Sequence, residues 1–251
     1  MNSKFNARLV FAPAFFFTLF LALAGQPALA DSTFTDTTFN LSNYSIVTYN
    51  NNPSSLTISV SQNPTAGSPT GPALEIDESN SGSAALGVTG LLNSSWYYNP
   101  STQGAIQSID FSTDMEITSP SVSGVLSGVT APALLYQNGN YYIDPIEVSG
   151  FTTNAYQTIT GSDLQASNFW LCDFTTGTYN MASNPNFSLS GGIIELGFAN
   201  LVSFPAETAS ATVYVDRVSW DVVSTPEPGS LVLLGAGLCA LALAARKLQN
   251  A

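Results

Sequence analysis

Short segments in which apolar and polar residues alternate recur along most of the chain. Leu56, Ile58 and Val60 alternate with polar neighbours, and Leu74 and Ile76 do the same further along. A period of two places the apolar side chains on one face of a β-strand. Between the two chain ends, no segment shows a sustained helical repeat. The pattern therefore predicts short strands that each bury one face.

Turn-forming residues separate these strands. Asn138-Gly139 lies at the centre of residues 133–143 and suits a type I′ hairpin, because both central positions need a positive φ. The last predicted strand spans residues 211–223 and would place Val213, Val215, Arg217 and Ser219 on one face and Tyr214, Asp216, Val218 and Trp220 on the other. Strands at intervals of roughly 10 to 20 residues predict an all-β domain, an antiparallel β-sandwich of the jelly-roll kind.

The first 30 residues have the three zones of a secretory signal peptide. A short basic start is followed by an apolar stretch over residues 9–24 and by small residues. Ala28 and Ala30 are the small side chains that signal peptidase requires, so we expect cleavage before Asp31. The alternative is an uncleaved membrane anchor, although the apolar stretch is shorter than the roughly 20 residues of a spanning helix.

The last 26 residues form a second three-part pattern. Pro226-Glu227-Pro228 comes first, an uncharged apolar stretch follows over residues 231–245, and Arg246 and Lys247 come next. The prolines end any incoming strand and leave an extended segment. The apolar stretch, rich in Leu, Ala and Gly, favours a helix of about 22 Å. Such a helix is short for a bilayer core of about 30 Å, although flanking residues can extend it.

This tail closely resembles the PEP-CTERM family of sorting signals. The resemblance implies recognition by an exosortase, a membrane protease of Gram-negative bacteria that also make exopolysaccharide. Pro226, Glu227 and Pro228 would be the recognition motif, and Arg246 and Lys247 the stop-transfer charges. The alternative is an ordinary single-pass tail anchor.

Together the two ends predict three parts. These are a signal peptide (1–30), an exported domain (31–225) and a sorting signal (226–251) with a transmembrane helix at 231–245. The basic pair stays on the cytoplasmic side of the inner membrane. We therefore expect a domain that is exported, transiently anchored in the inner membrane and finally located at the cell surface or outside the cell.

The exported part is strongly acidic. All 17 acidic residues lie between Asp31 and Glu227, whereas Arg217 is the one basic residue there, which gives a net charge of −16. Such a domain repels the phosphates of nucleic acids, so we expect no nucleic-acid partner. The same field attracts cations. Asp77, Glu78 and Asp216 are candidate ligands for a structural Ca²⁺, because this ion takes carboxylate oxygens, and we expect no other cofactor.

The residues of common catalytic sites are missing from the exported part. It contains no His and no Lys, and Cys172 is its only cysteine. This excludes His-dependent triads, Schiff-base lysines, His-ligated zinc and an internal disulfide, and we expect Cys172 to be buried. Glu75 and Asp77 share one strand face, but Asn80 occupies the position of the third acid in the similar Glu-x-Asp-x-x-Glu motif of concanavalin-like glycosidases. We therefore expect a protein that is not an enzyme.

Aromatic residues are the best candidates for sugar contacts. Trp96, Tyr97 and Tyr98 are interpreted as a loop that exposes three rings for stacking on a glycan. The alternative is that Trp96 and Tyr98 alternate into the core. Trp170 and Trp220 are expected in the core.

A weaker resemblance concerns the exported domain. Its early Phe34-Thr35-Asp36, its hairpin and its closing residues 214–220 are similar to segments of jelly-roll carbohydrate-binding modules and concanavalin-like lectins. The sequence predicts a non-enzymatic surface or matrix protein associated with exopolysaccharide. Two alternatives stay open, a carboxylate-dependent polysaccharide hydrolase or lyase and a Ca²⁺-dependent structural or adhesive module.

Overall fold

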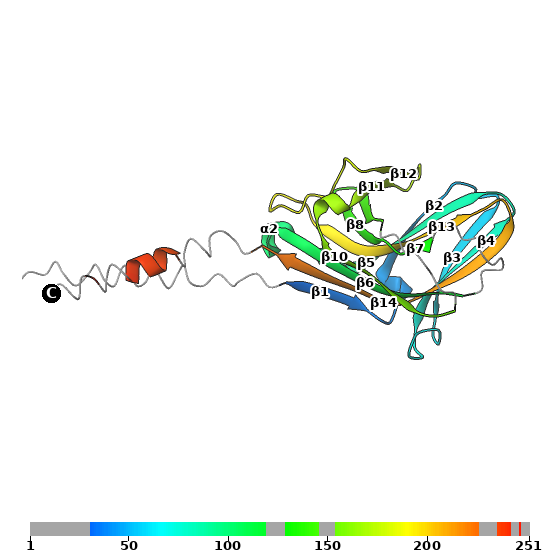
Figure 1. The fold of residues 1–251 in the computed structure, drawn as a ribbon, viewed down its shortest axis with the longest axis horizontal. Helices are drawn as coiled ribbons and strands as arrows, with labels where there is room; N and C mark the ends of the chain where they lie inside the picture. Colours follow the sequence, from blue (N-terminus) through cyan, green and yellow to red (C-terminus); the bar gives the residue numbers. More distant parts are fainter. Residues whose placement is uncertain (1–30, 119–128, 146–153, 226–234, 242–245, 247–251) are drawn as a thin grey trace, which may run out of the picture. The chain divides into compact units, whose positions relative to one another are not determined.

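The computed structural model describes residues 31–118, 129–145, 154–225, 235–241 and 246 of the chain. Contacts divide the chain into two units, one of them Ala30–Ser224 and the other Met1–Leu29 with Thr225–Ala251. Residues 235–241 are helical (Figure 1). No helix within the described ranges combines the length and the apolar composition needed to cross a membrane. The expected cleavage residues Ala28 and Ala30, the motif Pro226-Glu227-Pro228 and Lys247 lie outside the described residues, whereas Arg246 is described and exposed.

Two antiparallel sheets form the larger unit (Figure 1). The six-stranded sheet has the order β10 (Gln157–Leu164), β6 (Ile106–Thr118), β14 (Thr208–Ser224), β4 (Ala73–Ser81) and β3 (Leu56–Asn63), with β1 (Ser32–Asp36) also beside β14. The eight-stranded sheet has the order β12 (Thr178–Asn180), β11 (Trp170–Asp173), β9 (Asn140–Asp144), β8 (Ala133–Gln137), β13 (Ile194–Phe204), β5 (Ala85–Tyr98) and β2 (Tyr44–Asn50), with β7 (Val129–Thr130) also beside β13. Short helices are η1 (Leu41–Asn43), α2 (Pro100–Gln103) and η2 (Ala166–Asn168). The predicted antiparallel β-sandwich is confirmed.

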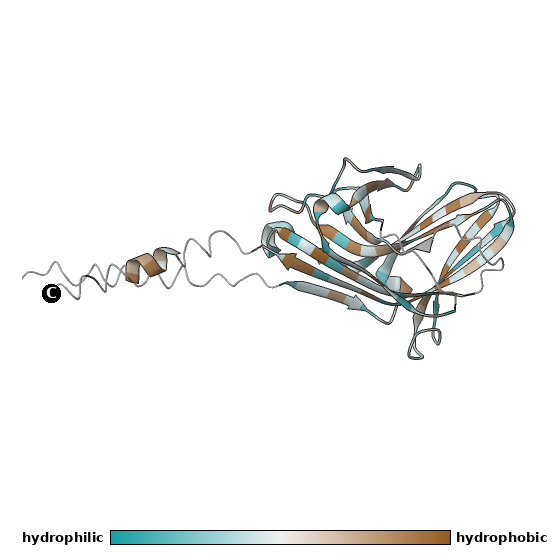
Figure 2. Cartoon of the chain, in the orientation of Figure 1, coloured by the Kyte–Doolittle hydropathy of each residue, from teal (hydrophilic) through white to brown (hydrophobic). Residues whose placement is uncertain are grey.

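The main core lies between the sheets and is built from alternating strand positions, which appear as alternating bands of hydropathy along the strands (Figure 2). In β4, Leu74 and Ile76 are fully buried, while Glu75 and Asp77 lie on the opposite face and are half-buried. In β14, the buried Trp220 packs against Phe111 of β6 with ring centroids 5.0 Å apart. The period of two seen in the sequence therefore sets the inner face of these strands, and Trp220 is in the core as expected. Trp170 is half-buried.

The predicted hairpin forms between β8 and β9. Asn138 and Gly139 occupy the turn with φ values of 53° and 85°. Both positive φ values match a type I′ turn, whose twist suits the flanking strands. The hairpin prediction is confirmed.

The faces predicted for the last strand are wrong after Asp216. The register of β14 against β6 shifts between Val215 and Arg217. An extra residue in one strand moves every later side chain to the opposite face. Val218 and Trp220 therefore join the buried face of Val213 and Val215. Arg217 and Ser219 turn outward, which keeps the charged guanidinium out of the core.

Glu78 is the most deeply buried acidic residue among the described residues of the sandwich. The alternation of β4 carries Glu78 inward, where it is 1% exposed. Asn200 of β13, on the other sheet, donates from Nδ2 to Glu78 Oε1 at 2.8 Å. Glu78 Oε2 and Asn200 Oδ1 are both buried, and neither has a hydrogen-bond partner within the described chain. The carboxyl oxygen of Glu78 and the amide oxygen of Asn200 therefore both lack a hydrogen-bond donor. A proton on the Glu78 carboxyl group would provide one.

The protonation of Glu78 follows from its surroundings. Burial raises the pKa of Glu78 from 4.5 to about 8, with the hydrogen bond from Asn200 opposing the shift and the charge of Asp77 adding to it. The carboxyl group is therefore neutral in the folded protein below about pH 8. Because the folded pKa exceeds the unfolded pKa, this group's contribution to stability is fully present below pH 4.5 and is lost as the pH rises through about 8.

Glu78→Gln is expected to remove this pH dependence. The glutamine amide keeps the neutral form and can donate to Asn200 Oδ1 at any pH. The unfolding free energy of the wild type, minus that of the variant, should fall by up to about 1.4 kcal/mol for each pH unit between the two pKa values. Urea titrations from about pH 5 to pH 9 measure this difference. Glu75→Gln, on the outer face of the same strand, is the control, and a difference that stays constant with pH for Glu78→Gln would show that Glu78 is ionised in the fold.

Candidate functional site

The eight-stranded sheet is apolar on both faces. In β8, Ala133 and Leu135 face the main core, so Leu134 between them points to the other side of the sheet. A second buried cluster lies there, and half-buried Val47, Tyr49, Tyr136, Tyr141 and Leu201 pack against it. We call this side of the sheet the second face. The cluster consists of Val88, Leu92, Leu134, Ile143, Cys172, Phe174 and Ala199.

Residues from the two edges of the sheet meet over the second face. Tyr49 lies on the edge strand β2, and Gly177 lies in the turn between β11 and β12 at the opposite edge. A side-chain carbon on Gly177 would overlap the Tyr49 ring. Phe174 reaches across the same face, since a side-chain carbon on Gly90 of β5 would lie 2.9 Å from its Cζ. Close contact at both glycines closes one part of the second face over the apolar cluster.

A row of tyrosines crosses the second face. The strand registers place one residue from each of six neighbouring strands opposite the next. Directly opposite residues of antiparallel strands have Cβ atoms about 4.5–5.5 Å apart. We call this row the tyrosine strip. It consists of Tyr97 (β5), Glu195 (β13), Tyr136 (β8), Tyr141 (β9), Cys172 (β11) and Tyr179 (β12).

The rings of the strip are held in place but remain accessible. Tyr136 and Tyr141 are half-buried, with ring centroids 4.8 Å apart, and Tyr141 packs edge-on against Phe174 at 5.0 Å. Tyr97 is 57% exposed and Tyr179 36% exposed. Burial raises the pKa of Tyr141, and the neighbouring Tyr136 and Glu195 raise it further. The Tyr141 phenol therefore stays protonated at neutral pH. Tyrosine hydroxyl groups can donate hydrogen bonds, while their rings offer apolar surface.

Cys172 is the buried member of the strip and is chemically unreactive. Its side chain is 3% exposed, as the sequence predicted. Burial raises the pKa of the Cys172 thiol to about 12, opposed by a hydrogen bond with Tyr179. Because the thiolate is the reactive form, this residue acts as a small apolar side chain.

Glu195 is the functional candidate that sequence reasoning missed. It lies between Tyr97 on β5 and Tyr136 on β8 and is half-buried. In the sequence it is one acid between Ile194 and Leu196, a pattern shared by every solvent-facing strand position. The one available signal was the alternation, which puts Glu195 and Tyr97 on outward positions of their strands. The pairing of these two strands is decided by the tertiary structure and cannot be read from the sequence.

The interpretation of Trp96, Tyr97 and Tyr98 as an exposed loop is wrong for two of the three residues. β5 continues to Tyr98, so the period of two sends Trp96 and Tyr98 into the main core, where they are 6% and 0% exposed. The Tyr98 hydroxyl donates to the carbonyl oxygens of Gln103 and Gly104 at 2.7 and 2.9 Å. The alternative, alternation into the core, is confirmed, and glycan contact stays a prediction for Tyr97 alone.

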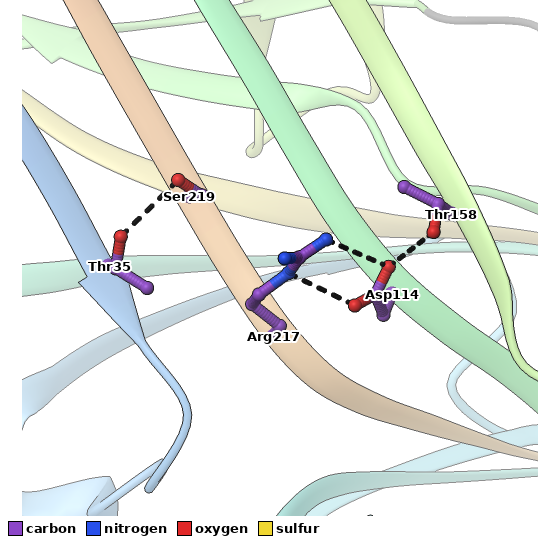
Figure 3. A network of polar contacts seen from close by, with 5 residues as sticks. All are labelled: Thr35, Asp114, Thr158, Arg217 and Ser219. Carbon is purple, nitrogen blue, oxygen red and sulfur yellow. Dashed lines mark hydrogen bonds and ion pairs between the residues drawn. The ribbon is translucent and has the colours of Figure 1, made fainter. Parts of the chain in front are cut away.

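The outer face of the six-stranded sheet carries acidic side chains and one cation. Arg217 Nε lies 3.0 Å from Asp114 Oδ2, and Thr158 donates to Asp114 Oδ1 at 2.6 Å (Figure 3). Beside this ion pair is a hollow with a cavity volume of about 190 Å³, lined by Ser68, Asp114, Tyr156, Gln157, Thr158 and Asp216. Arg217 is close to half exposed and Asp114 is partly exposed, so water weakens their attraction.

The structure divides the expected Ca²⁺ ligands. Asp77 lies on the outer face and accepts from the Thr212 hydroxyl at 2.6 Å, whereas Glu78 points into the core. Asp77 and Glu78 therefore cannot bind one ion together, because neighbouring strand residues point to opposite faces. Asp216 lines the hollow near the bulge. Among the described residues, no three His, Cys, Asp or Glu side chains are grouped to hold a metal, and Ca²⁺ binding stays a prediction.

Comparisons with known proteins match the tail to one family and find several similar solved structures. Residues 224–247 match the family described as the PEP-CTERM protein-sorting motif. Similar solved structures include carbohydrate-binding modules of the β-sandwich superfamily (TM-score 0.42, 10% identity, covering 76% of this chain and 74% of that chain). They also include the family 11 carbohydrate-binding module of the cellulase Lic26A-Cel5E of Clostridium thermocellum (0.38, 11%, 79% and 96%) and a protein of unknown function, SO2946, from Shewanella oneidensis MR-1 (0.38, 12%, 88% and 96%). No curated protein sequence matches the chain.

The closure of the second face can be tested with a pair of glycines. Gly177 and Gly139 both have positive φ, at 68° and 85°, so alanine strains the backbone at either position. An added carbon at Gly177 also overlaps Tyr49, whereas nothing lies within 4 Å of one at Gly139. Gly177→Ala should lower the unfolding free energy by about 2–4 kcal/mol and Gly139→Ala by about 1 kcal/mol. Equal losses in urea unfolding would show that the edges of the sheet do not depend on this contact.

Proposed function

We propose that this chain is an exported protein, sorted through its C-terminal motif, that binds polysaccharide outside the cell and is not an enzyme. The sorting motif at residues 224–247 supports export and exosortase processing. The tyrosine strip carries the proposal for the binding function. An extended row of accessible rings on one face of a folded domain is what a polysaccharide needs and what a compact small-molecule site does not provide.

The strip suits a sugar chain for three physical reasons. Its rings present flat apolar surface that can pack on the C–H faces of pyranose rings, and its phenols and Glu195 can hydrogen-bond the hydroxyl groups. Strands about 4.8 Å apart give the row a length of roughly 24 Å, which favours an elongated ligand. Packing of Tyr136 on Tyr141 and of Tyr141 on Phe174 holds the rings before the ligand arrives, so little side-chain entropy is lost on binding.

The composition of the strip favours binding over hydrolysis. Glycoside hydrolysis needs two carboxyl groups on opposite sides of the sugar bond. Within the described strip, Glu195 is the one carboxylate, flanked by Tyr97 and Tyr136. A surface of this kind can hold a sugar chain without supplying the second acid that cleavage requires.

Tyr97→Ala is expected to weaken polysaccharide binding by about tenfold or more, because it removes the most exposed ring of the strip. The exposed position means that the fold should tolerate the change. Tyr214→Ala, on the outer face of the six-stranded sheet, is the control and should leave binding unchanged. Affinity electrophoresis or calorimetry with a panel of soluble polysaccharides measures the effect. Binding that survives Tyr97→Ala at full strength would place the ligand elsewhere, and no binding to any polysaccharide would remove the proposed function.

Replacement of Pro226-Glu227-Pro228 by alanines is expected to stop processing. Intact mass spectrometry of the protein from a Gram-negative host with an exosortase should give a wild-type C-terminus near Pro228 and a variant that retains residues up to Ala251. Glu207→Ala, at an exposed position outside residues 224–247, is the control. A wild-type protein that keeps its last residue in such a host would contradict exosortase processing and would leave the binding proposal untouched.

A further inference from the structure

We infer that the tyrosine strip selects polysaccharides that carry free amino groups, and that Glu195 is the residue that recognises the amine. This inference rests on the proposed binding function and names its ligand class. The geometry comes from the strand registers, which place Tyr97 on one side of Glu195 and Tyr136 on the other. Tyr141 comes next in the row, and its raised pKa reflects the nearby charge of Glu195 in addition to burial and Tyr136. One carboxylate therefore lies among three tyrosine rings.

The carboxylate of Glu195 has no countercharge among the described residues of the sandwich. The basic residue there is Arg217, which pairs with Asp114 on the six-stranded sheet. No hydrogen bond to the Glu195 side chain occurs among the described residues. Because the residue is half-buried, its charge has lost part of its hydration. A ligand that brings a positive charge to this position supplies the countercharge that the described sandwich lacks.

The carboxylate of Glu195 and the neighbouring tyrosine rings both attract an ammonium group. The carboxylate forms a charge-assisted hydrogen bond with an ammonium group, which is roughly twice as strong as a bond between neutral groups. The flanking ring faces attract the same charge through cation–π interaction, which Tyr supports within about 6 Å of its centroid. A sugar hydroxyl can use the hydrogen bond but gains nothing from the ring quadrupole. An amino sugar therefore binds here more tightly than its uncharged counterpart.

The charge of the whole domain acts in the same direction. With 16 more acidic than basic residues between Asp31 and Glu227, the domain attracts a polycation and repels chains of uronic acids. A lone Ca²⁺ is a poorer match at this position, because it takes six to eight oxygen ligands, as a rule, and the strip offers one carboxylate and uncharged phenols. The local site and the long-range field both favour an amine-bearing chain.

The test compares glucosamine oligomers with the same oligomers after N-acetylation, at about pH 6, where the free amines are protonated. Calorimetry at low salt should show that the wild-type protein binds the amine form at least about tenfold more tightly. Glu195→Gln should lose this preference while its affinity for the N-acetylated form stays the same. Glu195→Asp, which keeps the charge, should retain most of the preference.

Glu75→Gln is the matched control for the overall charge. Glu75 lies on the outer face of the six-stranded sheet, where Asn63 donates to its Oε2 at 2.7 Å, so this variant removes the same charge away from the strip. If Glu75→Gln and Glu195→Gln weaken amine binding equally, the domain's field and not Glu195 selects the ligand, and the inference is overturned. Equal affinity of the wild type for both oligomers also overturns it. Binding to neutral polysaccharides that Tyr97→Ala removes would still support the proposed function in either case.

Discussion

The main core between the sheets is the constraint on which the binding surface depends. A strand has two faces, so a residue held in the core forces its neighbour out. Burial of Trp96 and Tyr98 turns Tyr97 outward, and burial of Ile194 and Leu196 turns Glu195 outward. The same rule applies in the β8–β9 hairpin, whose inward side chains, Tyr142 among them, leave Tyr136 and Tyr141 on the second face. The tyrosine strip therefore exists because several neighbouring strands each bury one face in the core, which leaves the strip residues on the opposite face.

The second face adds a different constraint, the contact between residues from opposite edges of the eight-stranded sheet. Tyr49 and Gly177 meet although their strands lie at opposite edges of the sheet. This contact and Phe174 close one part of the second face over the apolar cluster. The remaining part keeps its tyrosines accessible on a rigid base. A surface of this kind combines order with exposure, which is what a binding site for a polymer requires.

The excess of negative charge is distributed in three ways. Most acids of the sandwich lie on its surface, where water solvates them. Asp114 is paired with Arg217. Glu78 enters the core and becomes neutral because burial raises its pKa to about 8.

The two ends of the sandwich meet, since Ser224 N donates to Asp31 Oδ1 at 3.1 Å and β1 pairs with β14. The first and last strands of the sandwich therefore lie side by side.

The sequence by itself determined the fold class, the hairpin at Asn138-Gly139 and the sorting signal that begins at Pro226, because each depends on local patterns of period, turn chemistry or composition. It could not determine the faces of β14 beyond Asp216, since a bulge depends on how two strands pair and changes no local pattern. The burial of Glu78 was likewise decided by tertiary structure, because an acid in an alternating segment is the usual mark of a solvent-facing position. The tyrosine strip has the same origin. Its residues are separated by up to 82 positions between Tyr97 and Tyr179, and only the order of the strands brings them into one row.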